Sequence, residues 1–437
     1  MRRSAIRHFN GSVLVGIGLI CFYIVLARHA VYSDQIIKPV LYYGVSFLLM
    51  MFGNMLINKK KLQIPVNRLF WLITLIPFVY SSPNMLDLTL FTLGILIILT
   101  VKLNLQNIDT LYLVIKIVAV VNAVCVFLQV IDNTFFVSFA RERFSAGMYL
   151  YYMRVLSSSY ISGCNGIVGD TAGYLLNAIG ILCSFILICS MKKTKISSYI
   201  LLGILLIALL FTGKRSHLLC GVVAVMLLYI LSGKPTKKVK RILFSILAII
   251  GSYYIMRVMI VFFPNANTIN RVLDSINGMI LGEDISSGRN TLYGYAILQF
   301  KSAPITGIGW KVFNQLTTAL YNYSSIHYVN NDYLQILCET GIVGFACMFV
   351  PMYIFFFKTL RAFKVINKKP ELFDVKTRIA IVYSLFIQIY YLIYLFLENP
   401  LYNRSFFFMY ILSILIGYKV IDSCCLTSNY SKDQMEK

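Results

Sequence analysis

The chain alternates between long apolar runs and short polar turns. A helix needs about 17 to 25 apolar residues to cross the hydrocarbon core of a bilayer. Twelve segments approach or reach this length, at 11–28, 37–57, 68–81, 85–101, 110–131, 171–190, 197–212, 217–232, 242–263, 333–357, 379–397 and 405–422. The pattern predicts an all-α, polytopic integral membrane protein with about 12 transmembrane helices, in a single membrane domain over residues 1–437.

Two polar stretches are longer than a turn, at 132–170 and 264–332. With an even number of spans, both chain ends lie on one side of the membrane, and these two stretches lie on the other, outer side. In the larger one, TINRVLDSINGMIL places its apolar residues on one helical face, a pattern typical of an amphipathic helix lying flat on a bilayer. We therefore expect 132–170 to be an outer loop. We expect 264–332 to be a large outer loop that contains short amphipathic helices and carries the candidate site.

Composition supports the membrane prediction, and charge sets the orientation. Hydrophobic residues make up 59% of the chain and charged residues 13%, which is more apolar side chain than a water-soluble fold can cover. If both termini are cytoplasmic, the inner segments carry 25 lysines and arginines and the outer segments 12. This bias follows the positive-inside rule. The formal net charge of +23 therefore reflects topology near an anionic leaflet, and we expect no nucleic-acid partner.

The ten cysteines show no regular spacing. Seven lie within apolar runs, where cysteine behaves as a small hydrophobe. Cys424 and Cys425 lie near the C-terminal end, and Cys164 alone falls in the 132–170 loop. The spacing indicates neither a disulfide nor a metal site.

Arg289 is the first candidate site residue. It stands in SSGRN directly before an apolar helical pattern, so Ser287 is expected to cap a helix whose first turn contains Arg289. A cation there is unfavourable for the helix dipole, and an anion bound by the guanidinium and the free N–H groups would relieve this. The alternative is a surface arginine whose side chain reaches toward lipid headgroups.

Lys214 and Arg215 repeat this arrangement at the outer start of the predicted span 217–232. Basic residues on the outer side need a reason other than topology, and phosphate binding at a helix start supplies one. Two arginines that converge on one diphosphate would suit bidentate, charge-assisted bonding. The alternative is a solvated hairpin tip.

His327 and Asn331 lie just before the predicted span 333–357. An imidazole is near neutral at physiological pH, so His327 could accept a proton from a sugar hydroxyl. The alternative for a lone histidine is a structural hydrogen-bonding role. Asn331 belongs to the Asn-Asn-Asp sequence that leads into the span, and we expect it to contact substrate together with Lys214.

Glu339 is a carboxylate about two turns into the same span. An intramembrane carboxylate is costly and is usually paired or functional, and we expect Arg215 or Arg289 as its partner. The pair would belong to a substrate site or, alternatively, would be a buried structural ion pair. Gly341 and Gly344 are expected to allow close helix packing.

Three segments together resemble the bacterial O-antigen polymerase and ligase superfamily. SGRNTLYGYAILQFKSAPITGIGWKVF is similar to the family's arginine, aromatic-rich helix and Pro-x-x-Gly-x-Gly pattern. NNDYLQILCETGIVG resembles its His-Asn-x-Tyr-Leu and Glu-x-Gly-x-x-Gly pattern, and TGKRSHLL resembles its Ser-Arg at an outer helix start. The chain departs from the pattern at Asn330, where the family usually has histidine, and His327 is the nearest histidine.

The resemblance implies a metal-independent glycosyltransferase that needs no cofactor. Its donor would be an undecaprenyl-diphosphate-linked oligosaccharide at the outer face of the bacterial cytoplasmic (inner) membrane. Arg215 and Arg289 would hold the diphosphate and stabilise its charge as it leaves, while His327, if correctly placed, would deprotonate or orient an acceptor hydroxyl. Membrane lipids are further partners, and the resemblance leaves open a chain-length regulator protein. The sequence has no Asp-x-Asp pair, P-loop or GxSxG elbow for other chemistry.

Four functions fit the pattern to different degrees. We favour a polymerase that joins lipid-linked repeat units into O-antigen of lipopolysaccharide or into capsule. A ligase that transfers the glycan to lipid A-core or another acceptor is the first alternative, because no residue identifies the acceptor. A lipid-linked sugar transporter is the second, although transporters usually place polar groups at midplane between repeated halves. A monosaccharide transferase using a polyprenyl-phosphate sugar is less favoured. Such enzymes resemble proteins with acidic catalytic residues in the first outer loop, and here that loop offers only Asp34.

Overall fold

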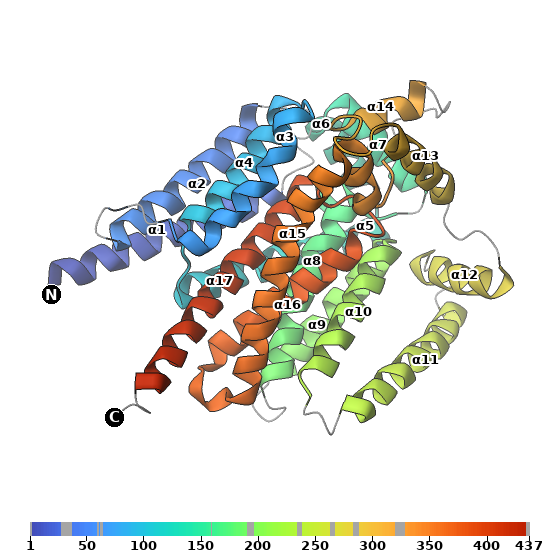
Figure 1. Cartoon of the computed structure of the whole chain (residues 1–437). Coiled ribbons are helices and arrows are strands. Elements are labelled where there is room, and N and C mark those ends of the chain that lie inside the picture. The colour runs from blue at the N-terminus through green and yellow to red at the C-terminus, as the bar shows by residue number, and fades with distance from the viewer. Residues whose placement is uncertain are drawn as a thin grey trace.

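The computed structural model describes residues 2–27, 37–58, 61, 64–158, 160–189, 196–233, 238–262, 267–282, 288–319 and 328–433. Each of the twelve predicted spans coincides with helix in these residues (Figure 1). The corresponding helices are α1 (Arg2–Ala27), α2 (Ile37–Ile57), η2 (Val66–Leu75) with α3 (Ile76–Tyr80), α4 (Met85–Thr100), α5 (Leu105–Ile131), α8 (Val168–Ile188), α9 (Ile196–Phe211), α10 (Arg215–Leu231), α11 (Lys238–Phe262), α15 (Asp332–Lys368), α16 (Val375–Tyr394) and α17 (Arg404–Asp433).

Seven helices of the described chain are long and apolar enough to cross a membrane: α1, α2, α5, α8, α15, α16 and α17. Four shorter apolar helical segments accompany them, formed by η2 with α3, by α4, by α9 and by α10. The described residues contain no β-strand. The prediction of an all-α, polytopic membrane protein is therefore confirmed.

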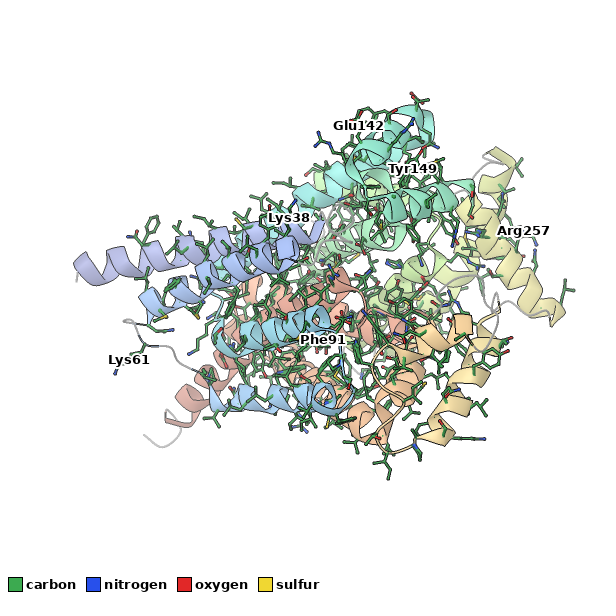
Figure 2. The ribbon with its side chains drawn as sticks, turned by 90° about the horizontal axis from the view of Figure 1, so that it is seen from above. Lys38, Lys61, Phe91, Glu142, Tyr149 and Arg257 are labelled. Atoms are coloured by element: carbon green, nitrogen blue, oxygen red, sulfur yellow. The ribbon has the colours of Figure 1, made fainter. Side chains whose placement is uncertain are left out.

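The helices differ in how deeply they are buried. In the most apolar stretch of α16, 89% of the residues are buried, against 72% in α8 and 28% in α2. α16 contacts α8, α10, α15 and α17, and α2 lies at the edge of the bundle (Figure 1). Phe91 of α4 lies among packed side chains in Figure 2, whereas Glu142 and Arg257 lie at the periphery. The apolar residues of α16 thus belong to the protein core, while α2 exposes one apolar face that includes Leu41, Val45 and Leu48, as expected for a helix in contact with lipid.

Short helices fill the two predicted outer loops. The first loop contains α6 (Thr134–Arg143), α7 (Ala146–Ser157) and η3 (Gly163–Asn165), and the second contains α12 (Asn267–Leu281), α13 (Arg289–Ser302) and α14 (Val312–Ala319). In Figure 1, α6, α7, α13 and α14 gather at the upper end of the molecule, and the last turns of α17 lie at the lower end. This arrangement separates the short helices from the C-terminal end of the chain.

α12 is the helix that the apolar periodicity of TINRVLDSINGMIL predicts. Its residues Ile269 and Leu273 are buried against Tyr253, Met256 and Ile260 of α11. Part of the apolar face is therefore covered by protein. Its expected position flat on the membrane surface stays a prediction.

The short helix η3 is held on the side of α5. Gln129 accepts a hydrogen bond from the backbone N–H of Gly163 at 2.6 Å, and the Asn165 amide donates to the Asn122 side chain at 2.6 Å. This docking brings the Sγ atoms of Cys125 and Cys164 to 2.8 Å. This proximity was not expected from the sequence, because one cysteine lies in an apolar run and the other in a loop.

Candidate functional site

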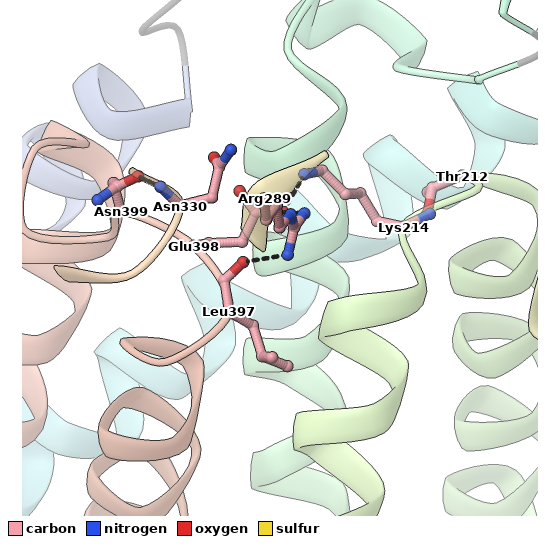
Figure 3. A network of polar contacts seen from close by, with 7 residues as sticks. All are labelled: Thr212, Lys214, Arg289, Asn330, Leu397, Glu398 and Asn399. Atoms are coloured by element: carbon pink, nitrogen blue, oxygen red, sulfur yellow. Dashed lines mark hydrogen bonds and ion pairs between the residues drawn. The ribbon is translucent and has the colours of Figure 1, made fainter. Parts of the chain in front are cut away.

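The candidate site forms where the turn between α16 and α17 meets the starts of α10 and α13. The Lys214 ammonium donates to Oε1 of Glu398 at 2.8 Å, and Nη2 of Arg289 donates to the same oxygen at 3.4 Å. Nη1 of Arg289 donates to the carbonyl oxygen of Leu397 at 2.7 Å (Figure 3). The fold thus brings two predicted cations together around a glutamate that the sequence did not single out.

The ionic contacts fix the charge of this group. The Glu398 side chain is 17% exposed, and those of Lys214 and Arg289 are 26% and 29% exposed. Burial would raise the pKa of the Glu398 carboxyl, but the charges of Lys214 and Arg289 outweigh burial and lower its pKa. Burial would likewise lower the pKa of Lys214, but the attraction of Glu398 raises it. Both partners are therefore charged at neutral pH and remain reachable from solvent.

Each of the two cations directly follows a glycine at the start of a helix. Gly213 (φ 84°) precedes Lys214, the N-cap of α10, and Gly288 (φ 80°) is the N-cap of α13, directly before Arg289. The left-handed conformation suits glycine and turns the chain sharply into each helix. Neither N-cap residue can cap its helix through a side chain, because Gly288 has none and the Lys214 ammonium only donates, so first-turn N–H groups accompany each cation. The expectation that Ser287 is the N-cap is wrong: Gly288 occupies that position, and Ser287 lies outside the described residues.

Arg215 lies beside this pair and is held by α12. Its Nη1 donates to the backbone oxygen of Arg271 at 3.1 Å and to the hydroxyl of Ser275. The Arg271 guanidinium lies 4.3 Å from the centroid of the Tyr160 ring, and its Nη1 is buried with no hydrogen-bond partner in the described chain. Arg271 and Arg289 both act electrostatically on Arg215. The start of α10 is therefore a strongly cationic region, to which α12 contributes Arg271.

The Asn-Asn-Asp sequence holds the turn that carries Glu398. The backbone N–H of Asn330 donates to Oδ1 of Asn399 at 2.8 Å. Asp332 is fully buried and accepts hydrogen bonds from the Asn399 amide at 2.8 Å and from the N–H of Leu401 at 2.7 Å. The Asn331 side chain caps α15 by accepting from the N–H of Leu334 at 3.1 Å. The Asn331 side chain also shares a hydrogen bond with the Tyr293 hydroxyl of α13. The expected contact of Asn331 with substrate stays a prediction.

The structure does not place His327, because it lies outside the described residues. Its expected role as proton acceptor therefore stays a prediction. Another histidine, His217, lies on α10 one turn after Lys214. It is fully buried, with its ring 4.6 Å from that of Tyr394 and 5.3 Å from that of Phe406. His217 is therefore enclosed by the protein and has no exposed surface.

The expected arginine partner of Glu339 is wrong. Glu339 is fully buried and accepts hydrogen bonds from the Tyr402 hydroxyl at 2.5 Å, the backbone N–H of Lys311 at 2.8 Å and the Gln335 amide at 3.0 Å. These donors come from the loop after α13, the turn before α17 and α15 itself. Because both carboxylate oxygens are bonded within the protein, the geometry favours a structural role for Glu339.

The two glycine motifs around Glu339 form one structure. Gly341 (φ 64°) kinks α15, and Gly307 (φ 71°) lies against this kink. A Cβ on Gly307 would lie 2.3 Å from the Glu339 carbonyl carbon, and one on Gly341 would lie 2.2 Å from the Ile305 oxygen. Backbone hydrogen bonds from Gly309 to Glu339 and from Ile342 to Pro304, both 2.9 Å, join the segments. Gly341 thus admits a loop, where packing against another helix was expected.

The residues described here form no cluster of three or more His, Cys, Asp or Glu side chains that could hold a metal ion. The chemistry that this arrangement supports is anion binding. Two cations bond one carboxylate oxygen in the same way as they would bond a phosphate oxygen. Further cationic charge and the N–H groups of two helix starts lie beside them.

Residues 200–349 match the family model described as O-antigen ligase. The match runs from α9 into α15 and contains Lys214, Arg215, Arg289 and Glu339, but it ends before Glu398. No curated protein matches the chain. The family match supports the resemblance to the O-antigen polymerase and ligase superfamily.

Proposed function

We propose that this chain, identified by residues 200–349 with the O-antigen polymerase and ligase superfamily, is a glycosyltransferase that polymerises lipid-linked repeat units. Its donor is an undecaprenyl-diphosphate-linked oligosaccharide, and its acceptor is a hydroxyl group of another repeat unit. The observation that supports this best is the convergence of Lys214 and Arg289 on one oxygen of Glu398. A carboxylate oxygen bonded by two cations is a close chemical analogue of a bound phosphate oxygen.

In this proposal the cations act mainly on the leaving group. When the bond between the sugar and the diphosphate breaks, negative charge grows on the departing oxygen. Lys214 and Arg289 bond that charge directly, and Arg215 adds a further cation. Fixed cations in a region partly shielded from water stabilise developing charge without reorganising during the reaction, so no nucleotide or metal is required for this step.

We place the reaction at the outer face of a bacterial cytoplasmic membrane, with both termini cytoplasmic. The positive-inside bias supports this orientation. The arrangement in Figure 1 agrees with it, because α13 lies at the end of the molecule opposite the last turns of α17. Membrane lipids surround the exposed apolar helices, and a chain-length regulator would bind as a separate protein.

A ligase is the second candidate, and one observation favours it: the matching family model is described as O-antigen ligase. Polymerase and ligase share the donor site and differ in the acceptor. The test is a gel profile of surface and lipid-linked glycans from a strain that lacks the gene, with and without its restoration. Single repeat units on the final acceptor, with a ladder on restoration, identify a polymerase. Full-length polymer retained on undecaprenyl diphosphate identifies a ligase and contradicts the first choice.

A transporter would use the same lipid-linked glycan without breaking a bond. Substituting Arg289 separates the two classes. Arg289→Ala that abolishes glycan transfer while lipid flipping continues supports the enzyme. Loss of flipping in that variant would instead identify a carrier.

A further inference from the structure

Glycosyl transfer to a hydroxyl group needs a group that takes the hydroxyl proton. Three titratable side chains near the turn between α16 and α17 are unsuitable, because His217, Asp332 and Glu339 are fully buried. Both carboxylate oxygens of Asp332 and of Glu339 are already bonded within the protein. Glu398 differs from all three, because its side chain is 17% exposed.

The contacts of Glu398 are uneven between its two oxygens. In the described part of the chain, the bonds from Lys214 and Arg289 both reach Oε1. The turn itself is held independently, since Asn399 and Leu401 bond Asp332. Arg289 also keeps a second anchor, its 2.7 Å bond to the Leu397 carbonyl. The Glu398 side chain can therefore leave the cations without loss of the turn or of the position of Arg289.

We propose that Glu398, in place of His327, is the proton acceptor for the incoming hydroxyl, released for this role when the donor diphosphate takes over Lys214 and Arg289. This inference rests on the proposed function and adds a residue that lies beyond the matching family segment. Before donor binding, Glu398 occupies the place of a phosphate oxygen and keeps the two cations apart from solvent anions. After donor binding, its carboxylate lies beside the diphosphate and faces the acceptor.

The reaction balances with the groups named. The acceptor oxygen forms a bond to the anomeric carbon of the donor sugar, and the bond from that carbon to the diphosphate oxygen breaks. The electron pair of the broken bond leaves with the undecaprenyl diphosphate, which Lys214 and Arg289 hold. The hydroxyl proton passes to the Glu398 carboxylate and is later released to water.

Donor binding and proton transfer are coupled by charge. While two cations hold Glu398, the pKa of its carboxyl is lowered, and it is a poor base. A diphosphate that binds these cations removes their effect and adds negative charge nearby, and both changes raise proton affinity. The base therefore becomes effective only after the donor is bound, and donor binding precedes acceptor activation.

The test compares donor affinity with turnover in the full-length protein, purified in lipid nanodiscs. Undecaprenyl diphosphate is the binding probe, and transfer is measured from the lipid-linked oligosaccharide. Glu398→Gln removes the negative charge that competes with the diphosphate for Lys214 and Arg289. We therefore expect the Kd for undecaprenyl diphosphate to fall by about three- to ten-fold. We expect kcat to fall by about 10²- to 10⁴-fold, the range that general bases contribute. The exposed Glu142→Gln on α6 is the matched control and should change neither value.

Two results would overturn the proposal. Glu398→Gln with wild-type kcat would show that another group takes the proton. Weaker diphosphate binding in Glu398→Gln would show that Glu398 serves only to hold the cations in place. Both results leave the proposed function intact, whereas a wild-type protein that does not bind undecaprenyl diphosphate contradicts the function itself.

Glu398→Asp provides the test if the Gln variant is not recovered folded. It keeps a carboxylate on a side chain that is one methylene shorter. We expect kcat to fall by about ten-fold, because the base is misplaced, while donor affinity is unchanged or higher. Weaker donor binding with an unchanged kcat would contradict the proposal.

Discussion

Glu339 and Glu398 are two glutamates that the fold shields from water in different ways. Glu339 is fully buried, and its hydrogen bonds come from a hydroxyl, a backbone N–H and a side-chain amide. Glu398 remains partly exposed, and both of its bonds come from cations at helix starts. Neutral, fully satisfied donors make a carboxylate part of the scaffold, while exchangeable ionic partners leave it open to competition by another anion.

The largest effect is expected on glycan transfer when a cation that contacts Glu398 is removed. Arg289→Ala should lower glycan transfer by about 10²- to 10³-fold, the usual loss when one group that stabilises transition-state charge is removed. The measurement is the glycan ladder of the gene-deleted strain restored with each variant at equal protein level. Lys301→Ala, an exposed cation in the last turn of the same helix, should restore the ladder fully. A complete ladder with Arg289→Ala would mean that the cations around Glu398 are not part of the transfer site.

Substitution of Glu339 should lower the stability of the protein and leave glycan transfer largely unchanged. Glu339→Gln replaces an oxygen acceptor by an amide, so the Lys311 and Tyr402 donors lose their shared acceptor or face an N–H group. We expect a loss of about 1 to 3 kcal/mol in the free energy of unfolding, seen as a lower thermal midpoint in detergent. Transfer per folded molecule should stay within a few-fold of wild type. A stable Glu339→Gln protein without transfer activity would show that Glu339 belongs to the transfer site and has more than a structural role.

A smaller effect is expected on thermal stability when the pH is lowered. The pKa of Glu398 is lowered in the folded protein from its ordinary value of 4.5, so the carboxylate contributes stability that is present above pH 4.5. That contribution is lost as the pH falls through the folded pKa, because the protonated group no longer holds Lys214 and Arg289. The thermal midpoint of wild type should therefore fall more steeply below pH 4.5 than that of Glu398→Gln. Parallel curves for the two proteins would show that the ion pair is not formed.

The smallest effect concerns the other predicted outer loop, 132–170. Cys125 and Cys164 are close enough to be joined by mild oxidation, since their Sγ atoms lie 2.8 Å apart. Peptide mass spectrometry without reduction should find these two cysteines linked in the oxidised protein, and Cys164→Ser should abolish the linkage. Because the loop already docks through Gln129 and Asn165, we expect little change in transfer. Exclusive linkage of Cys164 to another cysteine would contradict the position of η3 on α5.

The hydrophobic pattern alone was sufficient for the fold class. The apolar runs located the seven helices of the described chain that are long and apolar enough to cross a membrane, because in a bilayer the helix is the structure that satisfies its own backbone. The cations Lys214 and Arg289 were also predictable, since each stands at a helix start on the predicted outer side, where topology gives no reason for a basic residue. Their meeting on Glu398 was not predictable, because 75 positions separate the two cations and their common partner comes from a third segment.

Glu398 escaped prediction for a physical reason. It stands in a short turn between two apolar helices and lies in no motif, so nothing local marks it. The available signal was that this carboxylate falls on the same predicted outer face as two cations that topology does not explain. For Glu339, by contrast, a local signal led to a wrong prediction. The cost of an intramembrane carboxylate suggested an arginine partner. The loop at Gly307 and the hydroxyl of Tyr402 meet that cost with neutral donors, and this arrangement depends on the kink at Gly341.

The most direct test of the central claim is the affinity of the purified protein for undecaprenyl diphosphate, measured for wild type and for Lys214→Ala. The account predicts that wild type binds the diphosphate more tightly than undecaprenyl monophosphate. It also predicts that Lys214→Ala weakens diphosphate binding by at least about ten-fold, as expected for loss of a partly buried charge-assisted bond. Equal affinity of the two proteins for the diphosphate would contradict the claim that these cations form the donor site.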